Sequence, residues 1–373
     1  MRRALENLWD SSRRRRGIAG NLLYFLLLPL SWLYGVGLRL SQARRKAKPP
    51  FAHKMPVLIV GNLTTGGTGK TPMAETLARR LSAGGWKPAI LSRGYGGKRK
   101  NDPAVVGDGK ALLLGAAEAG DEPVMLARQL AGLGITVVVG VDRVAAAELA
   151  VESGARALVL DDGFQQRMRF PGSWKAVMVN TAEPFDRDTL LPAGNMREPK
   201  AALVEADAVI LTHADEVSAE RLGEARGIVR KLAPGSALAE AGYVLQGFER
   251  LDGSGPMAAD DVFGKRALAL SAIGYPEGFE RMLKKALGGE VMARREPDHH
   301  EWTAEEVSAA ISAGEKAGCA IFVTTPKDGR KMEPLPESSR KHLLYEARAG
   351  LAILSGEEDL EASLRHYLDG FGG

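Results

Sequence analysis

Apolar and polar positions along most of the chain follow an order that predicts strands separated by helices. After Pro49-Pro50, short apolar runs rich in Val, Ile, Leu and Ala are followed by longer amphipathic stretches. This order is typical of an α/β fold in which helices cover a parallel sheet. The predicted strands are residues 57–60, 89–92, 136–140, 157–160, 176–180, 208–212, 267–272, 320–324 and 351–354.

These strands form two series, which predicts two α/β domains. The first series lies within residues 45–243, and the second lies within residues 256–373. Residues 244–255 end in Gly253-Ser254-Gly255, a composition that favours a linker. Residues 1–44 precede the first strand and form a separate N-terminal segment. We therefore expect a larger domain, a linker and a smaller α/β lobe behind that segment.

The N-terminal segment is apolar between two basic clusters. Residues 18–38 are mostly apolar, with Arg13–Arg16 before them and Arg44-Arg45-Lys46 after them. This length is near the roughly 20 residues that cross the apolar layer of a bilayer. The segment therefore predicts a membrane-anchor helix, which either spans the bilayer or lies in its interface. A cleaved signal peptide and a buried core helix are the alternatives.

Charge and cysteine content restrict the possible partners. Residues 1–50 contain 11 Lys or Arg and 2 Asp or Glu, whereas the formal net charge of the whole chain is only +4. The rest of the chain is therefore slightly acidic. We expect no nucleic-acid partner, because nucleic-acid binding needs a basic face on the folded domain. The single cysteine, Cys319, cannot form an intramolecular disulfide, which favours a reducing compartment or a protein that is indifferent to redox conditions.

The residues after the first predicted strand have the pattern of a phosphate-binding loop. The run ends in Gly69-Lys70-Thr71, which opens a predicted helix. Glycines allow backbone N–H groups to close around phosphate oxygens, and the helix N-terminus favours an anion. The usual spacing has a glycine at position 64, where this chain has Thr64. The predicted ATP-binding residues are Thr65, Gly66, Gly67, Thr68, Gly69, Lys70 and Thr71.

A second strand ends in carboxylates that suit a nucleotide-bound Mg²⁺. Asp161 and Asp162 directly follow the apolar residues 157–160. In phosphate-loop enzymes an aspartate at such a strand end and the hydroxyl after the loop lysine hold the metal ion. We predict Thr71 with Asp161, Asp162 or both as the Mg²⁺ site, and Lys70 as the contact to the β- and γ-phosphates.

Three further polar clusters fall in predicted loops. Arg93 and Tyr95 lie in Ser92-Arg93-Gly94-Tyr95-Gly96, and Asp121 lies in Gly120-Asp121-Glu122-Pro123. The sequence Asp298-His299-His300 is the densest titratable group in a chain with six histidines, and a proton-relay site is one interpretation. A plain helix cap at Asp121 and a surface turn at residues 298–300 are the alternatives.

Together these motifs resemble the tetraacyldisaccharide 4'-kinase family, the lipid A 4'-kinases. The resemblance rests on seven motifs in family order, including Asn62-Leu63-Thr64 in place of the first loop glycine. They are G-N-L-T-T-G-G-T-G-K-T-P (61–72), S-R-G-Y-G (92–96), G-D-E-P (120–123), D-D-G-F-Q (161–165), L-P-A-G-N-M-R-E-P (191–199), D-H-H (298–300) and T-P-K-D (325–328). Asn195-Met196 and Gln166 depart from the more common Pro-Leu and His.

The resemblance implies transfer of the γ-phosphoryl group of ATP to the 4'-hydroxyl of a tetraacylated disaccharide 1-phosphate, with Mg²⁺ as cofactor. It implies that Asp121 and one histidine of the D-H-H motif activate the hydroxyl, and that Lys70 is the third catalytic residue. We favour His299 over His300 as this histidine. Phosphate contacts are expected from Arg93, Tyr95, Arg143, Gln165 and Arg197. The N-terminal helix is expected to bind the membrane surface on the cytoplasmic face of the bacterial inner membrane, where ATP is present.

Two other functions are compatible with the same phosphate-binding loop. A membrane-associated switch ATPase would hydrolyse ATP under the control of protein partners, with no small-molecule acceptor. A lipid-binding module with a degenerate loop would not bind ATP. The switch ATPase would be indifferent to Asp121 and His299, and ATP binding that vanishes in Lys70→Ala would argue against the lipid-binding module.

Overall fold

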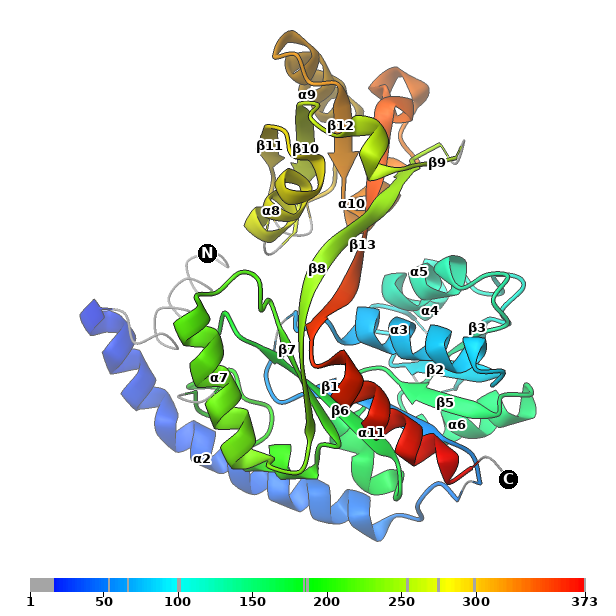
Figure 1. Ribbon diagram of the computed structural model, residues 1–373, viewed down its shortest axis with the longest axis vertical. Coiled ribbons are helices and arrows are strands. Elements are labelled where there is room, and N and C mark those ends of the chain that lie inside the picture. The colour runs from blue at the N-terminus through cyan, green and yellow to red at the C-terminus, as the bar shows by residue number, and fades with distance from the viewer. Residues whose placement is uncertain are drawn as a thin grey trace. The chain divides into compact units, whose positions relative to one another are not determined.

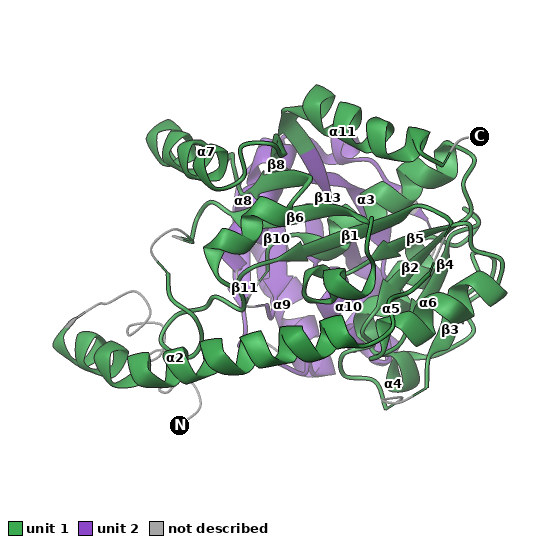
Figure 2. Cartoon of the chain, turned by 90° about the horizontal axis from the view of Figure 1, so that it is seen from below, with its two compact units in different colours: residues 1–242, 353–373 green, residues 243–352 purple. Residues whose placement is uncertain are grey.

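The computed structural model describes residues 17–52, 54–65, 67–98, 102–183, 185, 188–252, 255–273, 276–297 and 300–371. The chain forms two compact units, which Figure 2 shows in two colours. The first unit comprises Met1–Gly242 and Ile353–Gly373, and the second comprises Tyr243–Ala352. The α/β class predicted from the apolar runs is confirmed in both units.

The first unit is built on a mostly parallel sheet (Figure 1). Its strand order is β8-β7-β6-β1-β5-β2-β4-β3, and only the edge strand β3 is antiparallel to its neighbour. The strands are β1 (Val57–Asn62), β2 (Pro88–Ser92), β3 (Ala104–Gly107), β4 (Thr136–Val139), β5 (Ala157–Leu160), β6 (Trp174–Asn180), β7 (Ala208–Thr212) and β8 (Ala237–Arg250). Every residue of β1, β2, β4, β5 and β7 is buried, as expected for strands covered on both faces.

The strand order places β1 between β5 and β6, where successive connections leave in opposite directions. In open parallel sheets ligands bind beyond the carboxyl ends of the strands at such a switch point. The helices of this unit are α2 (Gly17–Ala47), α3 (Lys70–Ala83), α4 (Ala116–Ala119), α5 (Asp121–Gln129), α6 (Arg143–Glu152), α7 (Ala219–Leu232) and α11 (Glu357–Asp369), with 3₁₀ turns η1 (Phe164–Arg169) and η2 (Lys200–Glu205).

In the second unit the neighbouring strands β11, β10, β12 and β13 pair in parallel, and two apolar clusters form its core. Its strand order is β11-β10-β12-β13-β8, and β9 pairs with β8. Its elements are β9 (Pro256–Met257), β10 (Ala267–Ser271), β11 (Val291–Arg295), β12 (Ile321–Thr324), β13 (Leu344–Ser355), α8 (Pro276–Leu287), α9 (Ala304–Lys316), α10 (Pro326–Met332), η3 (Ala259–Val262), η4 (Glu337–Ser339) and η5 (Lys341–Leu343).

The unit boundaries differ from the predicted domains in two places. Most of the predicted linker 244–255 belongs to β8, because its apolar residues pair in a sheet despite Gly247. The chain then returns to the first unit at Ile353, so α11 covers the first sheet instead of ending a separate lobe. Tyr367 of α11 fixes this return, since its hydroxyl bonds both the N–H and the C=O of Val57 at 3.0 and 3.1 Å.

Helix α2 contains the predicted apolar segment 18–38 and continues through the basic cluster to Ala47. By length and composition, Ile18–Ala47 is a candidate membrane span, and 11% of its apolar window is buried. Large apolar side chains are exposed along it, among them Phe25, Leu26 and Trp32 at 64–70% exposure. This exposure does not fit a core helix, because a core helix would bury them. Arg13–Arg16 and the rest of residues 1–16 lie outside the described residues.

Candidate active site

The phosphate-binding loop connects the end of β1 to the start of α3. Gly69 adopts φ 79°, a left-handed conformation that glycine tolerates, and Lys70 begins the helix. Leu63, Thr64 and Thr68 are buried, and the Thr68 hydroxyl has no hydrogen-bond partner among the described residues. Gly66 lies outside the described residues. The strand, loop and helix predicted from the sequence are therefore in place for phosphate binding.

A second segment runs alongside the loop and explains the missing glycine. Thr64 forms an antiparallel bridge with Met196, and the Thr65 N–H donates to the Asn195 carbonyl at 2.8 Å. The Arg197 N–H donates to the Leu63 carbonyl at 2.6 Å. The first part of the loop is thus extended and paired, a conformation in which a side chain is tolerated at position 64. The sequence alone gave no signal for this pairing, because 130 residues separate the partners.

Thr71 and Asp161 meet where the predicted metal ligands belong. The Thr71 hydroxyl donates to Oδ2 of Asp161 at 2.9 Å. Oδ1 of Asp161 is buried and has no hydrogen-bond partner within the described part of the chain. Burial raises the pKa of Asp161 to about 6, against the lowering effect of the Thr71 hydrogen bond. A buried carboxylate oxygen without a partner, beside a hydroxyl, fits a hard cation such as Mg²⁺.

Asp162 is held by two cations in a strained conformation. Its φ of 51° is unusual for a residue with a side chain. Arg197 Nη1 contacts both carboxylate oxygens at 2.9 and 3.1 Å, and Lys70 Nζ lies 3.9 Å from Oδ1. Burial alone would raise the pKa of Asp162, but Lys70 and Arg197 outweigh it and lower the pKa. Backbone strain held by neighbouring groups is common at functional sites.

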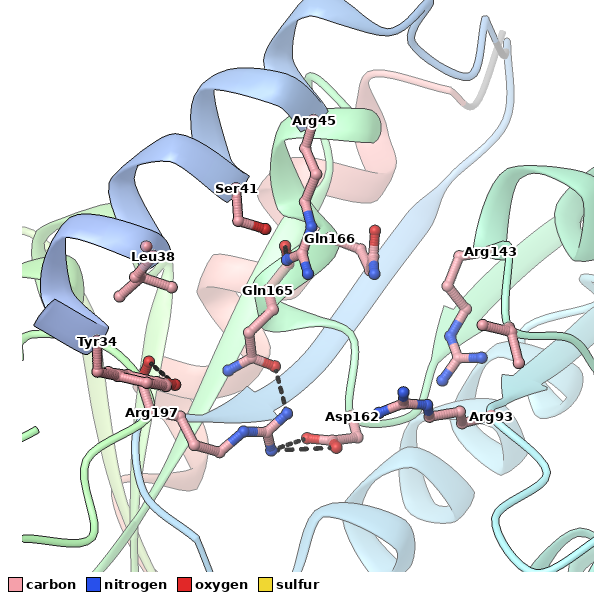
Figure 3. A pocket seen from close by; sticks show the side chains of 12 residues that line it. Tyr34, Leu38, Ser41, Arg45, Arg93, Arg143, Asp162, Gln165, Gln166 and Arg197 are labelled. Carbon is pink, nitrogen blue, oxygen red and sulfur yellow. Dashed lines mark hydrogen bonds and ion pairs between the residues drawn. The ribbon is translucent and has the colours of Figure 1, made fainter. Parts of the chain in front are cut away.

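A pocket of about 480 Å³ opens beside Asp162 (Figure 3). It is lined by Tyr34, Gly37, Leu38, Ser41, Arg45, Arg93, Val141, Arg143, Asp162, Gln165, Gln166 and Arg197. Four of these residues are arginines and one is an acid, so the lining carries net positive charge. Such a lining favours phosphate groups, for which the planar guanidinium is well suited.

The pocket arginines differ in the donors they leave available. Arg143 is buried, and its Nη1 and Nη2 donate to the carbonyls of Ser92, Gly140 and Asp161. Burial lowers its pKa to about 10, against the nearby aspartates. Arg143 therefore hydrogen-bonds to the ends of β2, β4 and β5 and adds positive charge to the pocket lining. Arg93 is exposed at the pocket, where Figure 3 shows its guanidinium near Asp162.

Helix α2 forms one wall of the pocket through polar contacts. The Tyr34 hydroxyl donates to the Arg197 carbonyl at 3.1 Å, and Arg45 Nη1 donates to the Gln165 carbonyl at 2.6 Å. Gln165 in turn accepts from Arg197 Nη2 at 3.0 Å. The predicted residues Gln165 and Arg197 are thus brought together, whereas Tyr34 and Arg45 were not predicted. Tyr34 lies in the apolar segment and Arg45 in the basic cluster that follows it, a pattern that indicates a membrane anchor and gives no signal for a pocket.

Asp121 lies at the start of α5, beside the loop that carries Arg93 and Tyr95. A Cβ at Gly120 would come within 2.3 Å of the Tyr95 carbonyl, so the two loops are in close backbone contact. Tyr95 itself is 87% exposed and is not among the residues that line the pocket. The neighbouring Glu122, which was not predicted, lies within electrostatic range of Lys70 and Asp161.

The D-H-H motif is described only in part. Asp298 and His299 lie outside the described residues. His300, in the second unit, has Nε2 3.0 Å from Oε2 of Glu306, at the start of α9. Glu306 also accepts from the Thr303 N–H in a capping box, so the His300 side chain is engaged in a helix cap.

Comparisons with known proteins point to one family. Residues 23–369 match the family model described as tetraacyldisaccharide-1-P 4'-kinase. A tetraacyldisaccharide 4'-kinase of Anaeromyxobacter dehalogenans is 41% identical over 367 residues, covering 96% of this chain and 94% of that protein. The enzyme of Syntrophus aciditrophicus is 36% identical over 345 residues, covering 90% and 91%. The crystal structure of LpxK from Aquifex aeolicus in complex with ATP is similar with a TM-score of 0.70 at 27% identity, covering 93% of this chain and 99% of that one.

Proposed function

The chain belongs to the tetraacyldisaccharide 4'-kinase family, and from this premise we propose that it phosphorylates the 4'-hydroxyl of tetraacyldisaccharide 1-phosphate with ATP, in lipid A biosynthesis. One observation carries the proposal for this chain. Asp162 pairs with the phosphate-loop Lys70 at 3.9 Å and also lines the arginine-rich pocket. A phosphoryl donor on the loop and an anionic acceptor in the pocket would therefore meet at Asp162.

At the donor end, the N–H groups of the loop and Lys70 bind the triphosphate. Lys70 exchanges its contact with Asp162 for phosphate oxygens, and Arg197 keeps the Asp162 carboxylate paired. Thr71 and Asp161 would hold Mg²⁺, which neutralises charge on the β- and γ-phosphates when bound. Burial in this region strengthens each of these electrostatic contacts.

At the acceptor end, the sugar hydroxyl attacks the γ-phosphorus. A bond from the 4'-oxygen to phosphorus forms, the bond from the γ-phosphorus to the β–γ bridging oxygen breaks, and ADP leaves. The hydroxyl proton passes to a base, for which we propose Asp121 together with His299. His300 suits this role less, because Glu306 already engages its imidazole. The 1-phosphate of the acceptor binds among Arg45, Arg93, Arg197 and the charge of Arg143.

Helix α2 brings the site to its lipid substrate. Its exposed apolar side chains enter the membrane interface, while Tyr34 and Arg45 keep it fixed to the pocket. A four-chained lipid leaves the bilayer with difficulty, so its head group is phosphorylated at the surface. Since ATP is the donor, we place the enzyme on the cytoplasmic face of the inner membrane. The switch-ATPase alternative is not favoured, because it gives the arginine-lined pocket no ligand.

The test is transfer of label from γ-³²P-ATP to tetraacyldisaccharide 1-phosphate in mixed detergent micelles. Wild-type protein is compared with Asp121→Ala and His299→Ala. We expect label in the lipid and a loss of at least about a hundredfold in each variant, the lower end of the range for general acid–base catalysis. Label found only as free phosphate would instead indicate an ATPase.

A further inference from the structure

A buried ion pair lies directly behind the residues that hold the pocket together. Arg167 of η1 and Glu198 have side chains that are only 5% and 1% exposed. Arg167 Nη1 donates to both carboxylate oxygens of Glu198 at 3.1 and 2.8 Å. The same guanidinium pairs with Glu205 at 2.7 Å, but the Glu205 side chain is 44% exposed. One arginine therefore has a buried partner and a half-exposed partner.

Glu198 contacts three parts of the first unit that are distant in sequence. Its backbone N–H donates to the carbonyl of Leu63 in the phosphate loop at 3.2 Å. Its carboxylate binds Arg167 and accepts from Gln42 of α2 at 3.4 Å. Arg197, the residue before it, places its side chain on Asp162. The phosphate loop, η1 and the membrane-facing helix thus meet at Glu198.

The pair is poorly suited to stabilise the fold by charge alone. Removing two charges from water costs several kcal/mol each, and apolar residues of similar volume are often as stabilising or more so. Burial accordingly raises the pKa of Glu198 even beside Arg167. Its hydrogen bonds are directional, however, and apolar packing would not reproduce that property.

We propose that the Arg167–Glu198 pair is a positioning element, which fixes Arg197 against Asp162 and joins α2 to the phosphate loop. Its effect on catalysis rests on the proposed function, whereas its effect on the loop does not. A misplacement of about 1 Å at a reacting centre can lower the rate about a hundredfold. Neither residue touches the pocket, so the effect is transmitted through Arg197.

The test replaces the pair by apolar residues in the full chain, as Arg167→Met/Glu198→Met, with Glu205→Gln as the matched control. Hydrogen–deuterium exchange is followed in peptides covering residues 57–65 and 189–198. We expect faster exchange there in the double variant, since the Thr65 and Arg197 N–H groups lose their fixed partners. We also expect kcat for lipid phosphorylation to fall at least about tenfold, with the KM for ATP within about threefold. Glu205→Gln should match the wild type in all three measurements.

The positioning role of the Arg167–Glu198 pair would be overturned if a folded double variant had the exchange rates and kcat of the wild type. It would also be overturned if Glu205→Gln had the same effect as the double variant. Should the double variant fail to fold, Glu198→Asp, which keeps the charge but is shorter by one methylene, is judged by the same measurements. If wild-type protein transfers no phosphoryl group to lipid, the proposed function fails, and the exchange data still decide the positioning role.

Discussion

Because its carboxylate is buried, we expect Asp161 to destabilise the folded protein when no nucleotide is bound. Its pKa rises from 3.8 to about 6 because burial disfavours the charged form. One pKa unit corresponds to about 1.4 kcal/mol, so holding Asp161 ionised in the folded state costs about 3 kcal/mol. Because the folded-state pKa is raised, this cost is absent below pH 3.8, grows between pH 3.8 and 6, and is complete above that range.

The variant Asp161→Asn removes the charge and changes little else. Its Oδ1 can still accept from Thr71, and its amide nitrogen takes the place of a carboxylate oxygen that has no hydrogen-bond partner among the described residues. We therefore expect the variant to be more stable than the wild type at pH 8, by up to about 3 kcal/mol. For a unit of this size that is a rise in Tm of about 6–12 °C.

The assay is thermal unfolding of both proteins without nucleotide and with EDTA, at pH 8 and pH 5. The difference should be roughly halved at pH 5, where much of Asp161 is protonated in the folded wild type. Addition of Mg²⁺ and ATP should raise the Tm of the wild type more than that of the variant. A variant less stable than the wild type at pH 8, or a difference that does not shrink in acid, would show that burial of the Asp161 charge does not destabilise the fold.

Three further changes test other parts of the structure. Lys70→Ala should lower phosphoryl transfer at least about a hundredfold with little change in Tm, since a phosphate contact is lost; retained activity would contradict its role. Tyr367→Phe should cost about 1–3 kcal/mol in denaturant unfolding with kcat unchanged, because two buried backbone groups at the start of β1 lose their partner. Unchanged stability would show that the Tyr367 hydrogen bonds do not stabilise the fold. Leu26→Glu/Leu33→Glu should reduce co-sedimentation with anionic vesicles at least about tenfold, whereas Leu354→Glu, also on an exposed leucine, should not; equal binding would separate α2 from the membrane.

The elements that were predicted correctly carry local signals in the sequence. The strands 157–160 and 208–212 have the predicted bounds, because uninterrupted apolar runs end at polar residues. The meeting of Thr71 with Asp161 also followed from the sequence, since neighbouring parallel strands end at one edge of a sheet. Two of the strands that were missed lack such signals, since β9 has two residues and β11 ends in Arg294-Arg295.

Contacts between distant segments could not be predicted from local pattern. The pairing of residues 195–197 with the phosphate loop, and the Arg167–Glu198 pair, depend on the order of strands around β1. The contact of Tyr34 with the Arg197 carbonyl joins residues 163 positions apart. These contacts form much of the pocket, so the phosphate-binding loop was more predictable than the pocket.

The position of the new phosphate on the lipid product tests the proposed 4'-kinase activity. Wild-type protein, ATP, Mg²⁺ and tetraacyldisaccharide 1-phosphate are incubated in mixed micelles, and the product is analysed by ¹H–³¹P correlation NMR. We expect a second phosphomonoester coupled to the proton at C4', with the 1-phosphate unchanged. A diphosphate at position 1, or inorganic phosphate with unchanged lipid, would contradict it.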